Sequence, residues 1–210
     1  MIVDDPGTDA LGLKPIQLDA LREVANIGAG HAATALSQMV GTQIDVSVPE
    51  ISLLPREDVP GLVIDRDAKI VAVLIRMVGD LTGQTVLTLS ERDALALADQ
   101  LLGRSVHEGA SAVGELEASA LEEVGNILAS ACMNALSAFM EMMLLPSVPS
   151  LMIDAPEVVM ANAHGEDSKL LICAATRFST KGTERALQGH FLIIPDTASL
   201  HAILEALRMG

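Results

Sequence analysis

The apolar residues of this chain are spaced in two ways, and the two spacings alternate along it. Two long stretches, 16–40 and 115–142, have an apolar residue at every third or fourth position, which predicts helices with one buried face. Two shorter stretches with the same spacing, 91–102 and 197–208, predict two further helices. Runs of Val, Ile and Leu predict strands at 43–54, 62–66, 69–77, 83–90, 147–154, 157–161, 169–177 and 189–195.

The two halves of the chain repeat one pattern. An ungapped alignment of 16–49 with 116–149 gives 13 identities in 34 positions, where chance gives roughly two or three. Short turns between the strands favour antiparallel pairing. We therefore predict an α+β fold, in which two α-β-β-β-α repeats are related by a pseudo-twofold axis and share one largely antiparallel sheet with helices packed on it. The expected parts are an N-terminal tail (1–15) and a single domain (16–210) made of repeat one (16–103), a linker (104–114) and repeat two (115–210).

Each long helix is predicted to carry a polar stripe opposite its apolar one. At about 100° per residue, Asp19, Glu23 and Asn26 fall on one side of the first helix. That stripe continues through Gly30, Ala33 and Ser37, and its counterpart in the second helix is Ser119, Glu123, Asn126, Ser130, Met133 and Ser137. The predicted buried stripes are Leu21, Val24, Gly28, Ala32, Ala35 and Met39, and Leu121, Val124, Leu128, Cys132, Ala135 and Phe139.

A Glu-x-x-Asn pair recurs on both polar stripes, although Asn is a poor helix former. One such pair would be ordinary helix surface. The neighbouring positions, however, have diverged between the copies while Glu and Asn have not: Arg22 faces Glu122, His31 faces Ala131 and Thr34 faces Asn134. Small residues beside each Asn would also let another macromolecule's backbone come close. The two copies together therefore favour a functional role.

The chemistry that suits an exposed Asn is the positioning of water. A carboxamide has one acceptor and two donors at fixed geometry, but it is too weak a base to take a proton. Positioning supplies most of the catalysis in phosphoryl hydrolysis, and GTPases use a Gln in this way. The chain has no GxxxxGK[ST] loop and no Asp, Glu and His set with metal-ligand spacing. A phosphorylated substrate must then bring its own metal and Lys, as receiver domains of response regulators do.

The residues that carry a family resemblance are these pairs with their spacing. The pattern [Asp/Ser]-x-x-x-Glu-x-x-Asn, followed after 22 residues by Pro, resembles the CheC/CheX/FliY family of chemotaxis phosphatases. The first copy is Asp19, Glu23, Asn26 and Pro49, and the second is Ser119, Glu123, Asn126 and Pro149. The segment NIGAGHAATALS (26–37) is similar to the CheC type in particular. The resemblance covers about 16 to 208.

This resemblance implies dephosphorylation of the response regulator CheY. It gives Asn26 and Asn126 the role of orienting the attacking water, and Glu23 and Glu123 a contact with the receiver's Lys. Asp19 and Ser119 would contact the partner or support the helix, and the small Gly30, Ala33 and Ser130 would lie against it. No cofactor or metal is expected on this chain, because Mg²⁺ belongs to the receiver. CheC-type members also bind the deamidase CheD.

Two departures from the family pattern concern the first and second helices. His31 stands where the family leads us to expect Asn, and 128–130 of the second helix is Leu-Ala-Ser rather than Gly-Ala-Gly. The two sites are therefore expected to differ in activity.

Alternative functions are a non-catalytic binding module, either a CheD-sequestering adaptor or a flagellar-switch-like scaffold. Intact Glu and Asn pairs in both halves argue against the scaffold, as does a chain that ends directly after repeat two. The internal duplication argues against a CheX-like dimer with one site in each chain. The adaptor stays open.

Composition excludes some functional classes and indicates the cellular location. Half of the residues are apolar, which is enough for a core, and the net charge is −15 with no cluster of Lys and Arg. Nucleic-acid binding is therefore set aside. No apolar run reaches about 18 residues, and the N-terminus lacks a basic segment followed by an apolar one. We expect a cytoplasmic protein without a membrane span or signal peptide.

Overall fold

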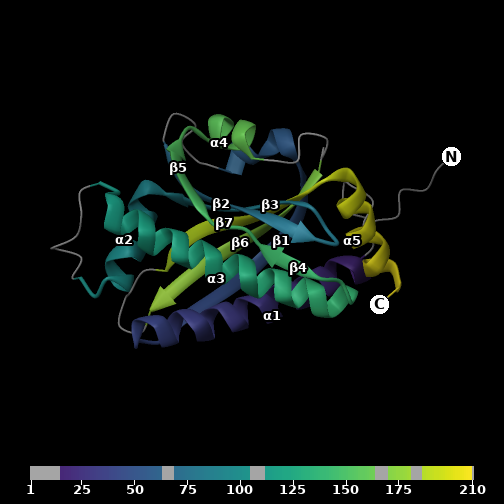
Figure 1. Cartoon of the computed structure of the whole chain (residues 1–210), viewed down its shortest axis with the longest axis horizontal. Coiled ribbons are helices and arrows are strands. Elements are labelled where there is room, and N and C mark those ends of the chain that lie inside the picture. Colours follow the sequence, from purple (N-terminus) through teal and green to yellow (C-terminus); the bar gives the residue numbers. More distant parts are fainter. Residues whose placement is uncertain (1–14, 63–68, 105–111, 164–169, 181–185, 210) are drawn as a thin grey trace.

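One seven-stranded sheet with helices on both faces makes up the part of the chain that the computed structural model describes (15–62, 69–104, 112–163, 170–180 and 186–209; Figure 1). The helices are α1 (Pro15–Val40), α2 (Glu91–Leu101), α3 (Glu115–Met140), α4 (Pro156–Asn162), α5 (Thr197–Met209) and the 3-10 helix η1 (Arg56–Leu62). The strands are β1 (Ile44–Pro55), β2 (Ile70–Gly79), β3 (Gly83–Ser90), β4 (Leu144–Pro146), β5 (Ser150–Asp154), β6 (Leu170–Thr180) and β7 (Leu187–Pro195). The predicted α+β class is confirmed.

The strands of the two repeats are interleaved in the sheet. Their order is β1-β6-β7-β3-β2-β4, with β5 also paired to β2, and every pairing is antiparallel. Among the described strands, β1 of repeat one pairs with β6 of repeat two and with no other. In return, β4 and β5 of repeat two pair with β2 of repeat one. Each repeat therefore supplies an outer strand to the other, and β3 and β7 meet in the middle.

The four longer helices cover one face of the sheet, and η1 and α4 cover part of the other (Figure 1). On β2, Val73 packs under the four helices, whereas its neighbours Ala72 and Leu74 join the core beneath η1 and α4. This two-sided burial explains why β2 is an almost continuous apolar run rather than an alternating one. Arg56 of η1 donates to the carbonyl oxygen of Ala163 at 2.7 Å, which ties η1 to the end of α4.

Three strand predictions need correction or fall outside the description. The predicted strand at 157–161 is wrong, because Pro156–Asn162 forms helix α4. Pro156 occupies the first turn, where its fixed φ suits a helix and its missing N–H costs nothing. The predicted strand at 147–154 begins only at Ser150, as β5, and the short strand β4 (Leu144–Pro146) lies just before the predicted range. For the strand predicted at 62–66, residue 62 ends η1 and 63–66 lie outside the described residues.

Two glycines inside the long helices are explained by close packing. A Cβ on Gly28 of α1 would lie 3.3 Å from the Cα of Cys132, so the two helix backbones approach one another here. A Cβ on Gly125 of α3 would lie 2.5 Å from a methyl carbon of Val73 on β2. Gly30 differs, since a Cβ there would meet nothing within 4 Å. The helices α1 and α3 run antiparallel across the sheet (Figure 1).

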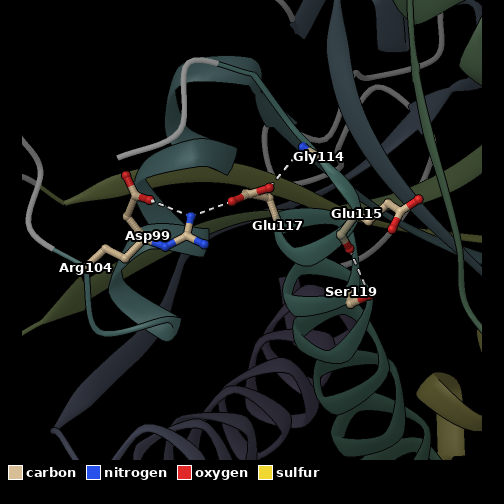
Figure 2. A network of polar contacts seen from close by, with 6 residues as sticks. All are labelled: Asp99, Arg104, Gly114, Glu115, Glu117 and Ser119. Atoms are coloured by element: carbon tan, nitrogen blue, oxygen red, sulfur yellow. Dashed lines mark hydrogen bonds and ion pairs between the residues drawn. The ribbon is translucent and has the colours of Figure 1, made fainter. Parts of the chain in front are cut away.

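A polar network fixes the start of α3 at the joint between the repeats (Figure 2). Glu117 accepts a hydrogen bond from the backbone N–H of Gly114 at 3.0 Å, which caps the first turn. The other carboxylate oxygen of Glu117 accepts from Arg104, whose guanidinium also lies 3.9 Å from Asp99 of α2. The hydrogen bond from Arg104 and those from the backbone hold the pKa of Glu117 below its usual value. The network thus links the end of repeat one to the helix that carries the second site.

The glycine packing gives a first prediction. Gly125→Ala forces Val73 or the helix to move, and we expect it to lower the free energy of unfolding by about 1–3 kcal/mol. The control Gly30→Ala adds the same methyl group at an open, exposed helix position, and it is expected to raise that free energy by about 0.5–1 kcal/mol. Urea unfolding followed by circular dichroism measures both. Equal midpoints for the two variants would contradict the packing argument.

The network gives a second prediction, about pH. Because the folded-state pKa of Glu117 is lowered, its stabilisation is present above the carboxyl's ordinary value of 4.5 and is lost as the pH falls through the folded-state pKa. Glu117→Gln should therefore lower the urea midpoint at pH 7, and the difference from the parent should shrink in acid. Glu115→Gln, an exposed position in the same turn, serves as the control and should change little. A difference that is independent of pH would count against the ionic role of Glu117.

Candidate functional site

The polar stripe of α1 lies on its outer side, away from the sheet. Asp19, Glu23 and Asn26 are all exposed, while Leu21 and Val24 on the opposite side are buried in the core. Nothing within the described residues makes a hydrogen bond with the Asn26 amide. Both donors and the acceptor of this side chain are therefore available to another molecule.

The stripe of α3 has the same orientation but is less open. Ser119 and Glu123 are exposed, and Asn126 is half-buried. Throughout the described part of the chain, the amide of Asn126 has no hydrogen-bond partner either. The helix beneath it is firmly held, since Leu121 and Val124 are completely buried. Both Glu-x-x-Asn pairs are thus carried on the outer side of helices whose inner side belongs to one core.

The side chains beside each Asn amide are short, which leaves space above the helix surface. Gly30 is exposed, and Ala33 and Ser130 are half-buried, so the predicted small residues do lie next to the two pairs. The antiparallel helices approach closely at Gly28 and Cys132. Asn26 and Asn126 each precede this contact along their own helix, so they lie on opposite sides of it. The two Glu-x-x-Asn pairs are therefore separate candidate sites on helices that cover the same face of the sheet.

Three positions on the predicted stripes of the long helices are placed differently by the structure. Met133 is fully buried, although the pattern assigned it to the polar stripe. Because α3 lies between α1 and α2 and contacts both, its buried face is wider than one stripe. Met39 and Phe139 were predicted to be buried, but both are exposed to about the same degree, 45% and 36%. Each lies in the last turn of its helix.

Pro49 and Pro149 lie where the regular strand pairing breaks. The β1–β6 register shifts between Ser47 and Glu50, and Pro149 falls in the gap that separates β4 from β5. Proline has no N–H to donate to a ladder, so it is tolerated at such points. The prolines therefore shape the strand that follows each long helix, and nothing in their position involves chemistry at the Asn residues.

The polar contacts around the two pairs are different. In the first, Arg22 forms an ion pair with Asp19 at 3.1 Å. In the second, the Ser119 hydroxyl donates to the carbonyl oxygen of Glu115 at 2.9 Å, within its own helix. Glu122 accepts from the backbone N–H of Leu151 at 3.1 Å, which ties α3 to β5. Ser119 thus supports its helix, whereas Asp19 is fully at the surface.

Sequence reasoning missed the Glu117 network, which positions the second site. The spacing Gly114-x-x-Glu117 is a helix-capping signal that could have been recognised. The contact from Arg104 could not, because its approach depends on how α2 packs beside α3.

The described residues show neither a metal-binding cluster nor an ionised thiol. No group of three or more His, Cys, Asp or Glu side chains among them could hold a metal ion. Burial raises the pKa of the Cys132 and Cys173 thiols to about 12, so both are neutral and unreactive at physiological pH. A cavity of about 40 Å³ beneath the helix crossing is lined almost entirely by apolar side chains and is too small for a substrate. None of the described helices has the length and apolar character needed to cross a bilayer.

Known proteins match both the sequence and the fold. A model of the CheC-like family matches 16–53 and 116–153, which include both prolines and all but the first residue of each long helix. The chain is 32% identical over 201 residues to the CheY-P phosphatase CheC of Bacillus subtilis, covering 93% of this chain and 96% of that one. In structure it resembles FliY of Thermotoga maritima, with a TM-score of 0.76 at 21% identity, covering 94% of this chain and 98% of that one. The middle domain of FliM from H. pylori has the same fold, with a TM-score of 0.62 at 14% identity, covering 92% and 99%. The chain therefore belongs to the CheC-like family.

Proposed function

We propose that this protein removes the phosphoryl group from the aspartyl phosphate of a CheY-type response regulator, at two sites centred on Asn26 and Asn126. Its relative of similar length in Bacillus subtilis is named a CheY-P phosphatase. The single observation that carries the proposal for this chain is the presence of two outward amides without hydrogen-bond partners among the described residues. Each of them follows a Glu three residues earlier on a helix whose other side is buried.

The proposed reaction takes place when a receiver docks on α1 or α3. The Asn amide enters the receiver's active site and holds a water molecule in line with the phosphorus. The water oxygen bonds to phosphorus, the bond from phosphorus to the aspartyl oxygen breaks, and inorganic phosphate and a free carboxylate result. The receiver brings the Mg²⁺, and Glu23 or Glu123 contacts the receiver's Lys so that the amide enters in register.

A rigid support is what this chain contributes beyond the two side chains. A misplacement of about 1 Å can cost roughly 10²-fold in rate when catalysis depends on positioning. The backbone contact at Gly28, the contact of Gly125 with Val73 and the cap at Glu117 all limit movement of α1 and α3. These contacts support a site that is formed before the partner arrives.

A binding module is the alternative, because the FliM middle domain shares this fold. Fold alone does not separate a scaffold from an enzyme. The two intact Glu and Asn pairs favour catalysis, since a scaffold has no use for a water-positioning amide. Binding of CheD without any release of phosphate from CheY would favour the adaptor instead.

The proposal predicts a graded loss of activity. The substrate is Mg²⁺-loaded CheY from the same organism, phosphorylated with acetyl phosphate. Asn26→Ala and Asn126→Ala should each remove the phosphatase activity of one site and leave that of the other. The double variant should lose about 10²-fold or more, since water is no longer positioned. Phosphate release measures this, and circular dichroism should show unchanged folding because Asn26 is exposed, Asn126 is only half-buried, and neither amide makes a hydrogen bond within the described residues.

The matched control is Asn134→Ala, an exposed Asn on the same helix α3 with no role in either pair. It should retain full activity. Undiminished release by the Asn26→Ala, Asn126→Ala double variant would move the active site elsewhere, and no release by the parent protein would overturn the proposal.

A further inference from the structure

The two proposed sites differ in charge. Helix α3 contains no Lys, Arg or His among its 26 residues, and it presents Glu115, Glu122 and Glu123 in addition to the capped Glu117. Helix α1 has the same length but carries Arg22 and His31 as well as its two carboxylates. The duplication has therefore kept Glu and Asn in both copies and changed the charge around them.

The largest change lies directly beside the functional Glu. Arg22 precedes Glu23, whereas Glu122 precedes Glu123, so the equivalent position differs by two charge units. Each side chain has a partner. Arg22 forms a solvent-exposed ion pair with Asp19 at 3.1 Å, and Glu122 accepts from the backbone N–H of Leu151 at 3.1 Å. Asp19 offsets the charge of Arg22 and its counterpart Ser119 is neutral, so positions 19, 22 and 23 sum to −1 whereas positions 119, 122 and 123 sum to −2.

The neighbouring helices do not cancel this difference. Beside α3, helix α2 exposes one acid and one base, Glu91 and Arg92. Beside α1, helix α5 exposes Glu205 and His201. With Glu117 paired to Arg104, the remaining side-chain charges sum to −1 on α1 and −3 on α3, so Glu205 narrows this difference but does not remove it.

We propose that the two sites select receivers by charge. The α3 site takes receivers whose docking surface is strongly cationic, the α1 site accepts less cationic ones, and Arg22 and Glu122 are the residues that set the difference. This inference rests on the proposed phosphatase function. Complementary charge acts mainly on the rate of encounter, by 10- to 10³-fold at low ionic strength, and it is screened over about 8 Å at physiological salt.

Variants with one intact site allow the electrostatic contribution at each site to be measured, as the dependence of kcat/KM on salt concentration. Asn126→Ala leaves the α1 site and Asn26→Ala leaves the α3 site, with acetyl-phosphate-charged CheY and Mg²⁺ as the probe. Between about 20 mM and 500 mM NaCl, we expect kcat/KM to fall about 10-fold at the α3 site and about 2- to 3-fold at the α1 site. The value of kcat at saturating receiver should stay constant at both, because salt acts on encounter.

Charge substitutions then assign the effect to residues. In the Asn126→Ala background, Arg22→Gln should make the salt dependence of the α1 site steeper. In the Asn26→Ala background, Glu122→Gln should make that of the α3 site shallower, and the Gln carbonyl can still accept from the Leu151 N–H. The matched control is Arg177→Gln, which removes one positive charge from an exposed position on the opposite face of the sheet. It should leave both salt dependences unchanged.

Several outcomes would overturn the inference while the phosphatase proposal stands. These are equal salt dependences at the two sites, a rate at the α3 site that rises with salt, and an effect of Arg177→Gln as large as that of Arg22→Gln. The last would show that net charge matters and that local charge does not. Absence of phosphate release by the parent protein at every salt concentration would instead overturn the proposed function itself.

Discussion

The constraint on which the molecule depends is the close contact of two long helices with each other and with one sheet. A Cβ at Gly28 would lie 3.3 Å from the Cα of Cys132, and one at Gly125 would lie 2.5 Å from a methyl carbon of Val73, so α1, α3 and β2 are closely packed. Interiors packed this tightly deform little. The outer sides of the same helices are therefore steady platforms, which fix the positions from which the Asn26 and Asn126 side chains project.

Much of this arrangement could be predicted from periodicity and repetition. Helices α1 and α3 begin and end within two residues of their predicted bounds, because long amphipathic stretches give the strongest signal in a sequence. Comparing the halves then separated the exposed Glu and Asn from their variable neighbours.

The rest required knowledge of tertiary neighbours. The sequence Pro-Glu-Val-Val-Met (156–160) has the β-branched residues of a strand, yet it forms a helix that packs beneath the sheet. Met133 has the angular position of a surface residue but is enclosed by the adjacent helices. From the sequence, Gly125 could be interpreted as a small residue that lets a partner protein approach α3. In the structure it instead makes room for the Val73 side chain of β2. Each case depends on which elements lie alongside, and local spacing does not contain that information.

The exchange of outer strands between the repeats has a consequence for how such a molecule can exist. A polypeptide of one repeat would leave its second strand without the neighbour that the other repeat provides, and it would need a second copy to complete its sheet. Its folding would then depend on protein concentration, as in an obligate dimer. Joining the two copies in one chain replaces this association with an intramolecular one at high effective concentration. The linked halves fold together at any dilution, and each is free to acquire substitutions that a symmetric dimer would have to carry twice.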